Sequence, residues 1–224
     1  MSGILYLVST PIGNDEDISI RALRLLREVD VVVCEEFKEG KRLLAKHGIQ
    51  KQLENLNEHN ERASTRWILD RLGEGKNIAL ISDAGTPVFS DPGQYLVHEA
   101  ISANIRIVPV PGANSLLPAL IVSGFPIENF LFFGWFSPKK DVRRRELQSL
   151  RAEKRTVAVM EAPYRLVPLL KDLVDVLGDK REICVAFDLT MPAEDIKWGS
   201  AKELLAYFSK SGKVGEFVVV IKGA

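Results

Sequence analysis

The chain has 224 residues, of which 46% are hydrophobic and 27% charged, and 30 Lys and Arg residues balance 30 Asp and Glu residues. This composition is that of an ordinary globular protein, and its zero net charge means that a polyanionic partner would need a local basic patch. Because no apolar run approaches the roughly 20 residues that span a bilayer, and because the amino terminus lacks the basic region of a signal peptide, we expect a cytoplasmic protein without a membrane anchor.

The first half of the chain alternates short apolar runs with longer amphipathic segments. A strand–helix alternation of this kind predicts a mainly parallel sheet. Asp17 or Ser19 is expected to cap the first helix. The expected strands are 4–8, 29–34, 78–81 and 105–110, and the expected helices are 18–29, 41–47, 60–73 and 95–104.

A Pro- and Gly-containing break at 109–112 interrupts this pattern. Four more strands are expected after it, and their more alternating character favours a mixed sheet. We place a domain boundary at Pro111, so that two α/β domains, 1–111 and 112–224, would hold a ligand between them. The second domain is expected to contain strands 130–136, 156–160, 183–189 and 216–222 and helices 115–123, 139–154, 165–177 and 201–208.

Three loops carry the chemistry that a binding site needs. The segment 81–93 contains two Gly, two Pro, two Asp, two Ser and a Thr after an apolar strand, and ligands bind at the carboxyl ends of strands in open α/β sheets. The turn 9–14 could bring backbone N–H groups to a ligand or be an ordinary tight turn; it matches neither G-x-G-x-x-G nor a Walker loop. The helix start at 111–115, with Asn114 or Ser115 as its cap, could hold a carboxylate or ribose oxygens, or be simple capping.

Acidic side chains also follow the strands. Glu35 and Glu36 come after the second strand, and Asp83 and Asp91 flank the 81–93 loop, so they are candidates for a general base. We predict no metal site, because the acids, histidines and cysteines lack metal-ligand spacing. The absence of G-x-S-x-G argues against a serine nucleophile of the esterase type.

The two cysteines, Cys34 and Cys184, lie far apart in apolar runs. We interpret them as buried free thiols in a reducing compartment.

The chief basic cluster lies on the expected helix 139–154 and the residues after it. A charge run is usually the solvated face of a helix, but its concentration in a neutral chain is equally compatible with phosphate contacts. The cluster consists of Lys139, Lys140, Arg143, Arg144, Arg145, Arg151, Lys154 and Arg155.

The sequence resembles the S-adenosyl-L-methionine (SAM)-dependent tetrapyrrole methylase superfamily. Within it, the likeness is strongest to the bacterial 16S rRNA ribose 2′-O-methyltransferases of the small-subunit type I group. The resemblance spans nearly the whole chain, and the 82–87 segment Ser-Asp-Ala-Gly-Thr-Pro is its most specific part. The matching segments are 5–14 with 17–19, 80–93, 110–112 with Ser115, 123–126, 130–136 with 138–140, and 160–166.

The resemblance implies two α/β domains with SAM in the cleft between them, a homodimer, and rRNA or the small ribosomal subunit as the partner. It implies that SAM contacts Pro11, Asp83, Ala84, Gly85, Thr86, Ser90, Ser115, Leu116, Glu161 and Leu189. With an RNA substrate, phosphate contacts are expected from Lys139, Lys140, Arg143, Arg144 and Arg145. A ribose hydroxyl is a very weak acid, so a general base is expected, with Glu36, Glu35 and Asp83 as candidates.

The sequence departs from the rRNA group on the acceptor side. The group's Glu-Asp-Thr-Arg reads Glu-Glu-Phe-Lys at 35–38, and its Arg-Glu-Leu-Thr-Lys reads Phe-Asp-Leu-Thr-Met at 187–191. The carboxyl-terminal module of many members is also absent from this sequence. Two alternatives therefore stay open: a methylase of a tetrapyrrole or another small acceptor, and an inactive module that binds SAM or RNA.

Overall fold

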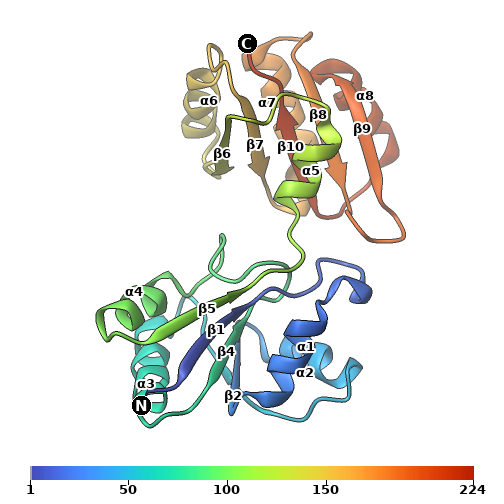
Figure 1. Cartoon of the computed structure of the whole chain (residues 1–224). Coiled ribbons are helices and arrows are strands. Elements are labelled where there is room, and N and C mark those ends of the chain that lie inside the picture. The colour runs from blue at the N-terminus through green and yellow to red at the C-terminus, as the bar shows by residue number, and fades with distance from the viewer. Residues whose placement is uncertain (1) are drawn as a thin grey trace. The chain divides into compact units, whose positions relative to one another are not determined.

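The computed structural model describes residues 2–224, which divide into two compact units (Figure 1). Unit 1 ends at Asn114, and unit 2 runs from Ser115 to Ala224. The sequence placed the boundary at Pro111. Residues 112–114 belong to unit 1, where the Thr86 hydroxyl donates a hydrogen bond to the carbonyl oxygen of Ala113 at 3.5 Å.

Unit 1 is built on a five-stranded sheet whose strands are all parallel, in the order β3-β2-β4-β1-β5. The predicted parallel sheet is confirmed. Its strands are β1 (Ile4–Val8), β2 (Val31–Cys34), β3 (Gln52–Asn55), β4 (Ile78–Ile81) and β5 (Arg106–Val110). Its helices are the 3₁₀ turn η1 (Asp15–Asp17), α1 (Ile20–Glu28), α2 (Phe37–Lys46), α3 (Glu61–Gly73) and α4 (Gln94–Ser102).

Helices cover both faces of this sheet. In the central strands β2 and β4 every residue is buried, which is why they read as continuous apolar runs. Alternate residues point to opposite faces, so Ala79 and Ile81 of β4 pack with α1 and α2, while Ile78 and Leu80 pack with α3 and α4.

Two expectations for unit 1 are wrong in detail. The edge strand β3 was not predicted, because its sequence Gln-Leu-Glu-Asn has no apolar alternation. Helix α2 begins at Phe37, four residues before the expected start. Of the two proposed caps of α1, Ser19 is the one that functions: its hydroxyl oxygen accepts a hydrogen bond from the Ala22 N–H at 3.0 Å.

Unit 2 contains a mixed five-stranded sheet in the order β6-β7-β10-β8-β9, as predicted for its class. Strands β6 and β7 are parallel, and the other neighbours are antiparallel. The strands are β6 (Phe130–Trp135), β7 (Thr156–Met160), β8 (Glu182–Phe187), β9 (Asp195–Ser200) and β10 (Phe217–Ile221). The helices are α5 (Leu116–Ser123), α6 (Lys140–Ser149), the 3₁₀ turn η2 (Pro163–Arg165), α7 (Leu166–Leu177) and α8 (Ala201–Ser211).

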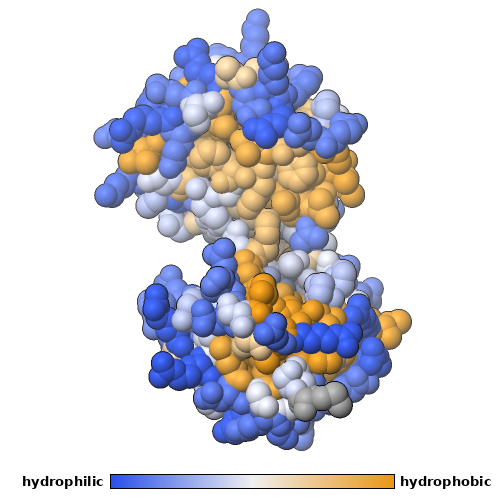
Figure 2. All heavy atoms as spheres, turned by 60° about the vertical axis from the view of Figure 1, so that its left-hand side comes forward, coloured by the Kyte–Doolittle hydropathy of each residue, from blue (hydrophilic) through white to orange (hydrophobic). Residues whose placement is uncertain are grey.

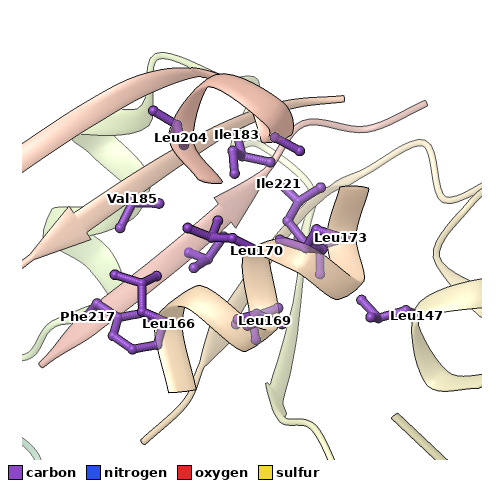
Figure 3. Close-up of a cluster of buried hydrophobic side chains, with 14 of the residues drawn as sticks. Leu147, Leu166, Leu169, Leu170, Leu173, Ile183, Val185, Leu204, Phe217 and Ile221 are labelled. Atoms are coloured by element: carbon purple, nitrogen blue, oxygen red, sulfur yellow. The ribbon is translucent and has the colours of Figure 1, made fainter. Parts of the chain in front are cut away.

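The core of unit 2 lies between this sheet and α6, α7 and α8. Leu166, Leu169, Leu170 and Leu173 of α7 project onto β8 and β10 (Figure 3). Helix α5 packs against β8 and β10 without entering this core.

The sequence predicted four strands in unit 2 and missed β9, an edge strand that is buried in only one position. That position is Asp195, whose carboxylate accepts hydrogen bonds from Tyr207 Oη at 2.8 Å and from Lys213, and forms an ion pair with Lys197. Burial alone would raise the pKa of Asp195, but the hydrogen bonds from the two lysines and the tyrosine outweigh it and lower the pKa to about 2.

Candidate functional site

The sheet of unit 1 has a topological switch point between β1 and β4. These strands are neighbours and parallel, yet β1 leads into α1 on one face and β4 leads into α4 on the other. Loops that leave adjacent strands toward opposite faces create a crevice at the carboxyl edge of the sheet, where ligands bind in open α/β folds. The 9–14 turn and the 82–93 loop are the two loops at this position.

Hydrogen bonds join these two loops directly. Thr10 and Gly85 form an isolated antiparallel bridge, in which the backbone nitrogen of each residue lies 2.9 or 3.1 Å from the carbonyl oxygen of the other. The Thr10 hydroxyl donates to the carbonyl oxygen of Ser82 at 3.0 Å, and the hydroxyls of Ser9 and Thr86 lie 3.1 Å apart. The two loops are therefore joined through backbone groups and small hydroxyl side chains.

The 82–93 loop has an unusual backbone. Gly85 has a φ of 88°, and a Cβ there would lie 3.3 Å from Ile12 Cγ2. Val88 and Ser90 also have positive φ, at 71° and 66°. A positive φ is rare for a β-branched residue such as Val88, and each residue held in this conformation costs about 1–3 kcal/mol. Strain of this kind persists where a loop must hold a particular shape for binding.

Acidic side chains gather at the same edge of the sheet. The Asp83 carboxylate accepts a hydrogen bond from the Glu36 N–H at 3.2 Å, and Asp91 accepts one from the Ser82 hydroxyl at 2.5 Å. Burial and the nearby carboxylates of Asp91 and Asp83 raise the pKa of Glu35. Burial also raises the pKa of Asp83 and that of Asp91. The structure thus brings the three candidate bases, Glu35, Glu36 and Asp83, to one edge.

A raised carboxyl pKa has two consequences at this edge. Holding several carboxylates ionised in one place costs stability at neutral pH, because the folded state favours the protonated form more than the unfolded chain does. It also makes each carboxylate a stronger base and the edge attractive to a cation. Among residues 2–224, no group of three or more His, Cys, Asp or Glu side chains is arranged to hold a metal ion.

The cofactor residues expected from unit 2 lie at strand ends and at the start of α5. Because β7 and β8 both run antiparallel to β10, Glu161 after β7 and Leu189 after β8 lie at the same edge of the sheet. Leu189 is buried between two residues with positive φ, Asp188 and Thr190. Of the two proposed caps of α5, Ser115 occupies the cap position, but its side chain makes no capping hydrogen bond.

Glu161 is fully enclosed. Its Oε1 accepts the Ala162 N–H at 3.0 Å and lies 3.2 Å from Nη1 of Arg165, while the buried Oε2 has no hydrogen-bond partner. A buried acceptor without a donor is costly, so it marks a place where a ligand donor group would be stabilised.

The basic helix is only partly a solvated face, and the expectation for Arg143 needs correction. Arg143 is 8% exposed, its Nε donates to Asp172 at 2.7 Å, and its Nη1 donates to the carbonyl oxygens of Ser137 and Pro138. It is a structural residue of unit 2, so it is not available to an RNA phosphate. Lys139, Lys140 and Arg145 are exposed, and Arg144 is half-buried beside Asp175 at 3.6 Å.

One residue that supports the 82–93 loop was not predicted from the sequence. Glu61, at the start of α3, accepts the N–H groups of Gly93 and Tyr95 at 2.8 and 3.2 Å. Its carboxylate thereby satisfies the free N–H groups at the start of α4 and fixes the end of the 82–93 loop. No local sequence signal pairs residues 32 positions apart, so this contact could not be predicted.

Both cysteines are free and buried, as expected. Burial raises the pKa of Cys34 to about 12 and that of Cys184 to about 11, which makes them unreactive. In the part of the chain that is described, no helix combines the length and apolar character needed to cross a membrane.

A family model described as Tetrapyrrole (Corrin/Porphyrin) Methylases matches residues 4–205. The chain belongs to this tetrapyrrole methylase family. The match spans nearly all of unit 1 and unit 2 as far as Leu205, so the sheet of unit 1 and its 9–14 and 82–93 loops are parts of a methyltransferase fold.

Curated relatives match over almost the whole chain. The chain is 44% identical over 222 residues to ribosomal RNA small subunit methyltransferase I of Synechocystis, which covers 99% of this chain and 80% of that protein. It is 43% identical over 221 residues to the protein of the same name from Thermotoga maritima, covering 99% of both.

Among solved structures, uroporphyrin-III-C-methyltransferase from Thermus thermophilus is similar with a TM-score of 0.68 at 19% identity. The likeness covers 98% of this chain and 94% of that one. At this level of identity it shows the fold of the tetrapyrrole methylase family and nothing about the acceptor.

Proposed function

We propose that this methyltransferase uses SAM to methylate a ribose 2′-hydroxyl of 16S rRNA in the small ribosomal subunit. The observation that carries the proposal is the identity of 43–44% over 99% of the chain with proteins named ribosomal RNA small subunit methyltransferase I. The site geometry supports it, because the loops that match this group are those at the switch point of unit 1.

The crevice residues fit a cofactor with the chemistry of SAM. When bound, SAM supplies a methyl group activated by a sulfonium ion. The φ of 88° at Gly85 favours glycine, so a side chain there would strain the loop that we assign to the cofactor. The acidic edge favours a cation. We assign the cofactor contacts in unit 1 to Pro11, Asp83, Ala84, Gly85, Thr86 and Ser90.

In unit 2 we assign cofactor contacts to Ser115, Leu116, Glu161 and Leu189. Glu161 is included because its Oε2 lacks a donor that an amino group would supply. The prediction that SAM lies in a cleft between the two domains stays a prediction. Loss of SAM affinity in Glu161→Gln, with an unchanged melting temperature, would support the assignment.

The general base is sought among Glu36, Glu35 and Asp83. A carboxylate with a raised pKa is better matched to removing a proton from a weakly acidic hydroxyl than an ordinary one. Glu35 and Asp83 have this property, and Glu36 is the most exposed of the three. The variants Glu35→Gln, Glu36→Gln and Asp83→Asn should separate them: the base is the residue whose loss lowers kcat by about 100-fold or more and leaves the SAM affinity unchanged.

We assign phosphate contacts to Lys139, Lys140, Arg144 and Arg145. The buried Arg143 is no longer included. Neutralising Lys139 and Lys140 together should weaken RNA binding and make its salt dependence shallower. An unchanged salt dependence would show that this surface is an ordinary solvated helix face that does not contact RNA phosphates.

We also propose a homodimer. Unit 2 exposes the apolar side chains of Leu117 and Ile121 on α5, and one face of unit 2 carries an apolar area bordered by hydrophilic side chains (Figure 2). Exposed apolar side chains are typical of a protein interface. Sedimentation of Ile121→Glu should give a lighter species than the wild type; the same mass for both would contradict an interface at α5.

The acceptor is tested by incubating the protein with labelled SAM and either small ribosomal subunits or tetrapyrrole precursors. Label in the subunit RNA is the expected result. Label in the tetrapyrrole would favour the small-molecule alternative. Label in neither acceptor, with SAM still bound in a calorimetric titration, would favour an inactive binding module.

A further inference from the structure

A bulge in β6 turns Trp135 away from the core of unit 2. Leu131 and Phe133 of β6 pack against the core under α6, α7 and α8, and regular alternation would send Trp135 to the same side. The register with β7 shifts at this point, and Gly134 adopts a φ of 81°. As a result Phe136 enters the core instead, and Trp135 is 48% exposed. Bulges that re-aim one side chain are over-represented beside functional sites.

A second exposed aromatic residue, Tyr164, lies in the turn that follows the neighbouring strand β7. Trp135 is in register with Met160, the last residue of β7, and Tyr164 follows in the 3₁₀ turn η2. Tyr164 is 73% exposed. Arg165, the next residue, donates a hydrogen bond to the carbonyl oxygen of Ser137 at 3.3 Å, which ties the turn after β7 to the loop after β6.

The loop after β6 is held by several hydrogen bonds and is positively charged at its tip. Arg143 donates to the carbonyl oxygens of Ser137 and Pro138, and the Ser137 N–H donates to Glu146 at 2.9 Å. Lys139 and Lys140 follow directly, and both are exposed without an ion-pair partner among residues 2–224. A surface that is already ordered loses little conformational entropy when it binds.

We propose that Trp135 and Tyr164 form a base-stacking platform that, with Lys139 and Lys140, binds a single-stranded segment of the RNA substrate. Aromatic faces beside exposed cations are the combination that binds unpaired nucleotides, because bases stack on the rings while phosphates contact the cations. A duplex offers no free base faces, so the platform distinguishes single-stranded from paired RNA. The inference rests on the proposed function only in taking RNA as the substrate.

Binding of a short single-stranded oligoribonucleotide to the full chain tests the platform. Trp135→Leu removes the ring and keeps an apolar side chain, and it should weaken binding by roughly 5- to 150-fold, the range found when one base loses its aromatic partner. Trp135→Phe keeps a ring and should retain most of the affinity. Trp198→Leu is the matched control, since Trp198 is 55% exposed on the opposite edge strand β9, and it should leave the affinity unchanged.

Tryptophan fluorescence gives a readout independent of affinity. Stacked bases quench indole emission, so RNA should quench the wild type and Trp198→Leu, but quench Trp135→Leu much less. Equal affinity and equal quenching in Trp135→Leu and the wild type would overturn the proposal. An equal loss of affinity in both leucine variants would also overturn it, because the effect would then not belong to the β6 edge.

The duplex form of the same oligonucleotide separates stacking from charge. The single strand should bind more tightly, and only its binding should respond to Trp135→Leu; an equal response of the duplex would contradict stacking. Failure of the proposed function would give a different result from failure of the platform. If the wild type binds the single strand and is quenched but does not methylate small subunits, the platform stands and the acceptor assignment falls.

Discussion

Replacing Arg143 by leucine is expected to destabilise unit 2 and not to act first on RNA binding. The Arg143 guanidinium forms a buried ion pair with Asp172 at 2.7 Å and two hydrogen bonds to the Ser137 and Pro138 carbonyls at 3.2 Å. The side chains of the pair are 10% and 5% exposed. The substitution therefore leaves a carboxylate buried without a partner, and it frees the loop after β6.

Removing one partner of a buried ion pair costs about 3–5 kcal/mol, because the remaining charge stays desolvated. For a protein of this size, a change of that magnitude lowers the melting temperature by roughly 6–20 °C. The double variant Arg143→Leu/Asp172→Leu leaves no buried charge and should recover most of the loss. Arg144→Leu is the control: its half-exposed pair with Asp175 at 3.6 Å is worth about 0–1 kcal/mol.

Thermal unfolding of the wild type and these variants, followed by circular dichroism, measures the effect. The expected order of melting temperature is wild type and Arg144→Leu highest, the double variant next, and Arg143→Leu lowest. The reasoning would be refuted if Arg143→Leu melted with the wild type and instead lost affinity for RNA. In that case the side chain would reach phosphate in solution and the buried pair would carry little energy.

Three further results are expected. Gly85→Val forces a β-branched residue into a φ of 88°, so it should abolish the heat of SAM binding while far-UV circular dichroism is retained; an unchanged SAM affinity would place the cofactor elsewhere. The pKa of Asp195 is lowered to about 2, below the unfolded value of about 3.9, so the ionised carboxylate stabilises the fold fully above pH ~4 and this stabilisation is lost between about pH 4 and 2. Asp195→Asn should therefore lower the melting temperature at pH 7 but hardly at pH 2. Equal losses at the two pH values would contradict the lowered pKa. Cys34 and Cys184, whose pKa values burial raises to about 12 and about 11, should resist iodoacetamide at pH 8 until the chain is unfolded; rapid labelling of the native protein would show that the thiols are accessible.

The central strands could be predicted from sequence because burial on both faces leaves a continuous apolar run. Strands β2 and β4 have this form. The edge strands β3 and β9 do not, since one side of each faces solvent and the residues that pair are polar or mixed. The other two edge strands, β5 and β6, are apolar enough to be predicted, so β3 and β9 were missed because of their polar composition and not because of their place at an edge.

The error at Arg143 came from interpreting a charge run without its helical phase. Arg143, Leu147 and Leu150 are spaced by four and three residues and therefore share a helix face, and the two leucines are buried. That spacing was a usable signal. In contrast, the partner Asp172 lies on α7, 29 positions away, and no sequence pattern joins the two.

The candidate site likewise has a part that the sequence predicts and a part that it does not. The loops after β1 and β4 could be found from their composition, because glycine, proline and hydroxyl residues concentrate there. That they face each other at a switch point depends on the strand order, which a single sequence does not give. The exposure of Trp135 depends on a one-residue bulge, which changes the direction of the side chain without changing the apolar pattern.

The most direct test of the proposed reaction is the position of the transferred methyl group. Small ribosomal subunits are incubated with the protein and labelled SAM, and the RNA is then hydrolysed in alkali, a reaction that needs a free 2′-hydroxyl as nucleophile. Methylation of a ribose 2′-hydroxyl predicts that the label is recovered in an alkali-stable dinucleotide. Label recovered only in mononucleotides would indicate a base as the acceptor, and RNA without label would contradict the proposed function altogether.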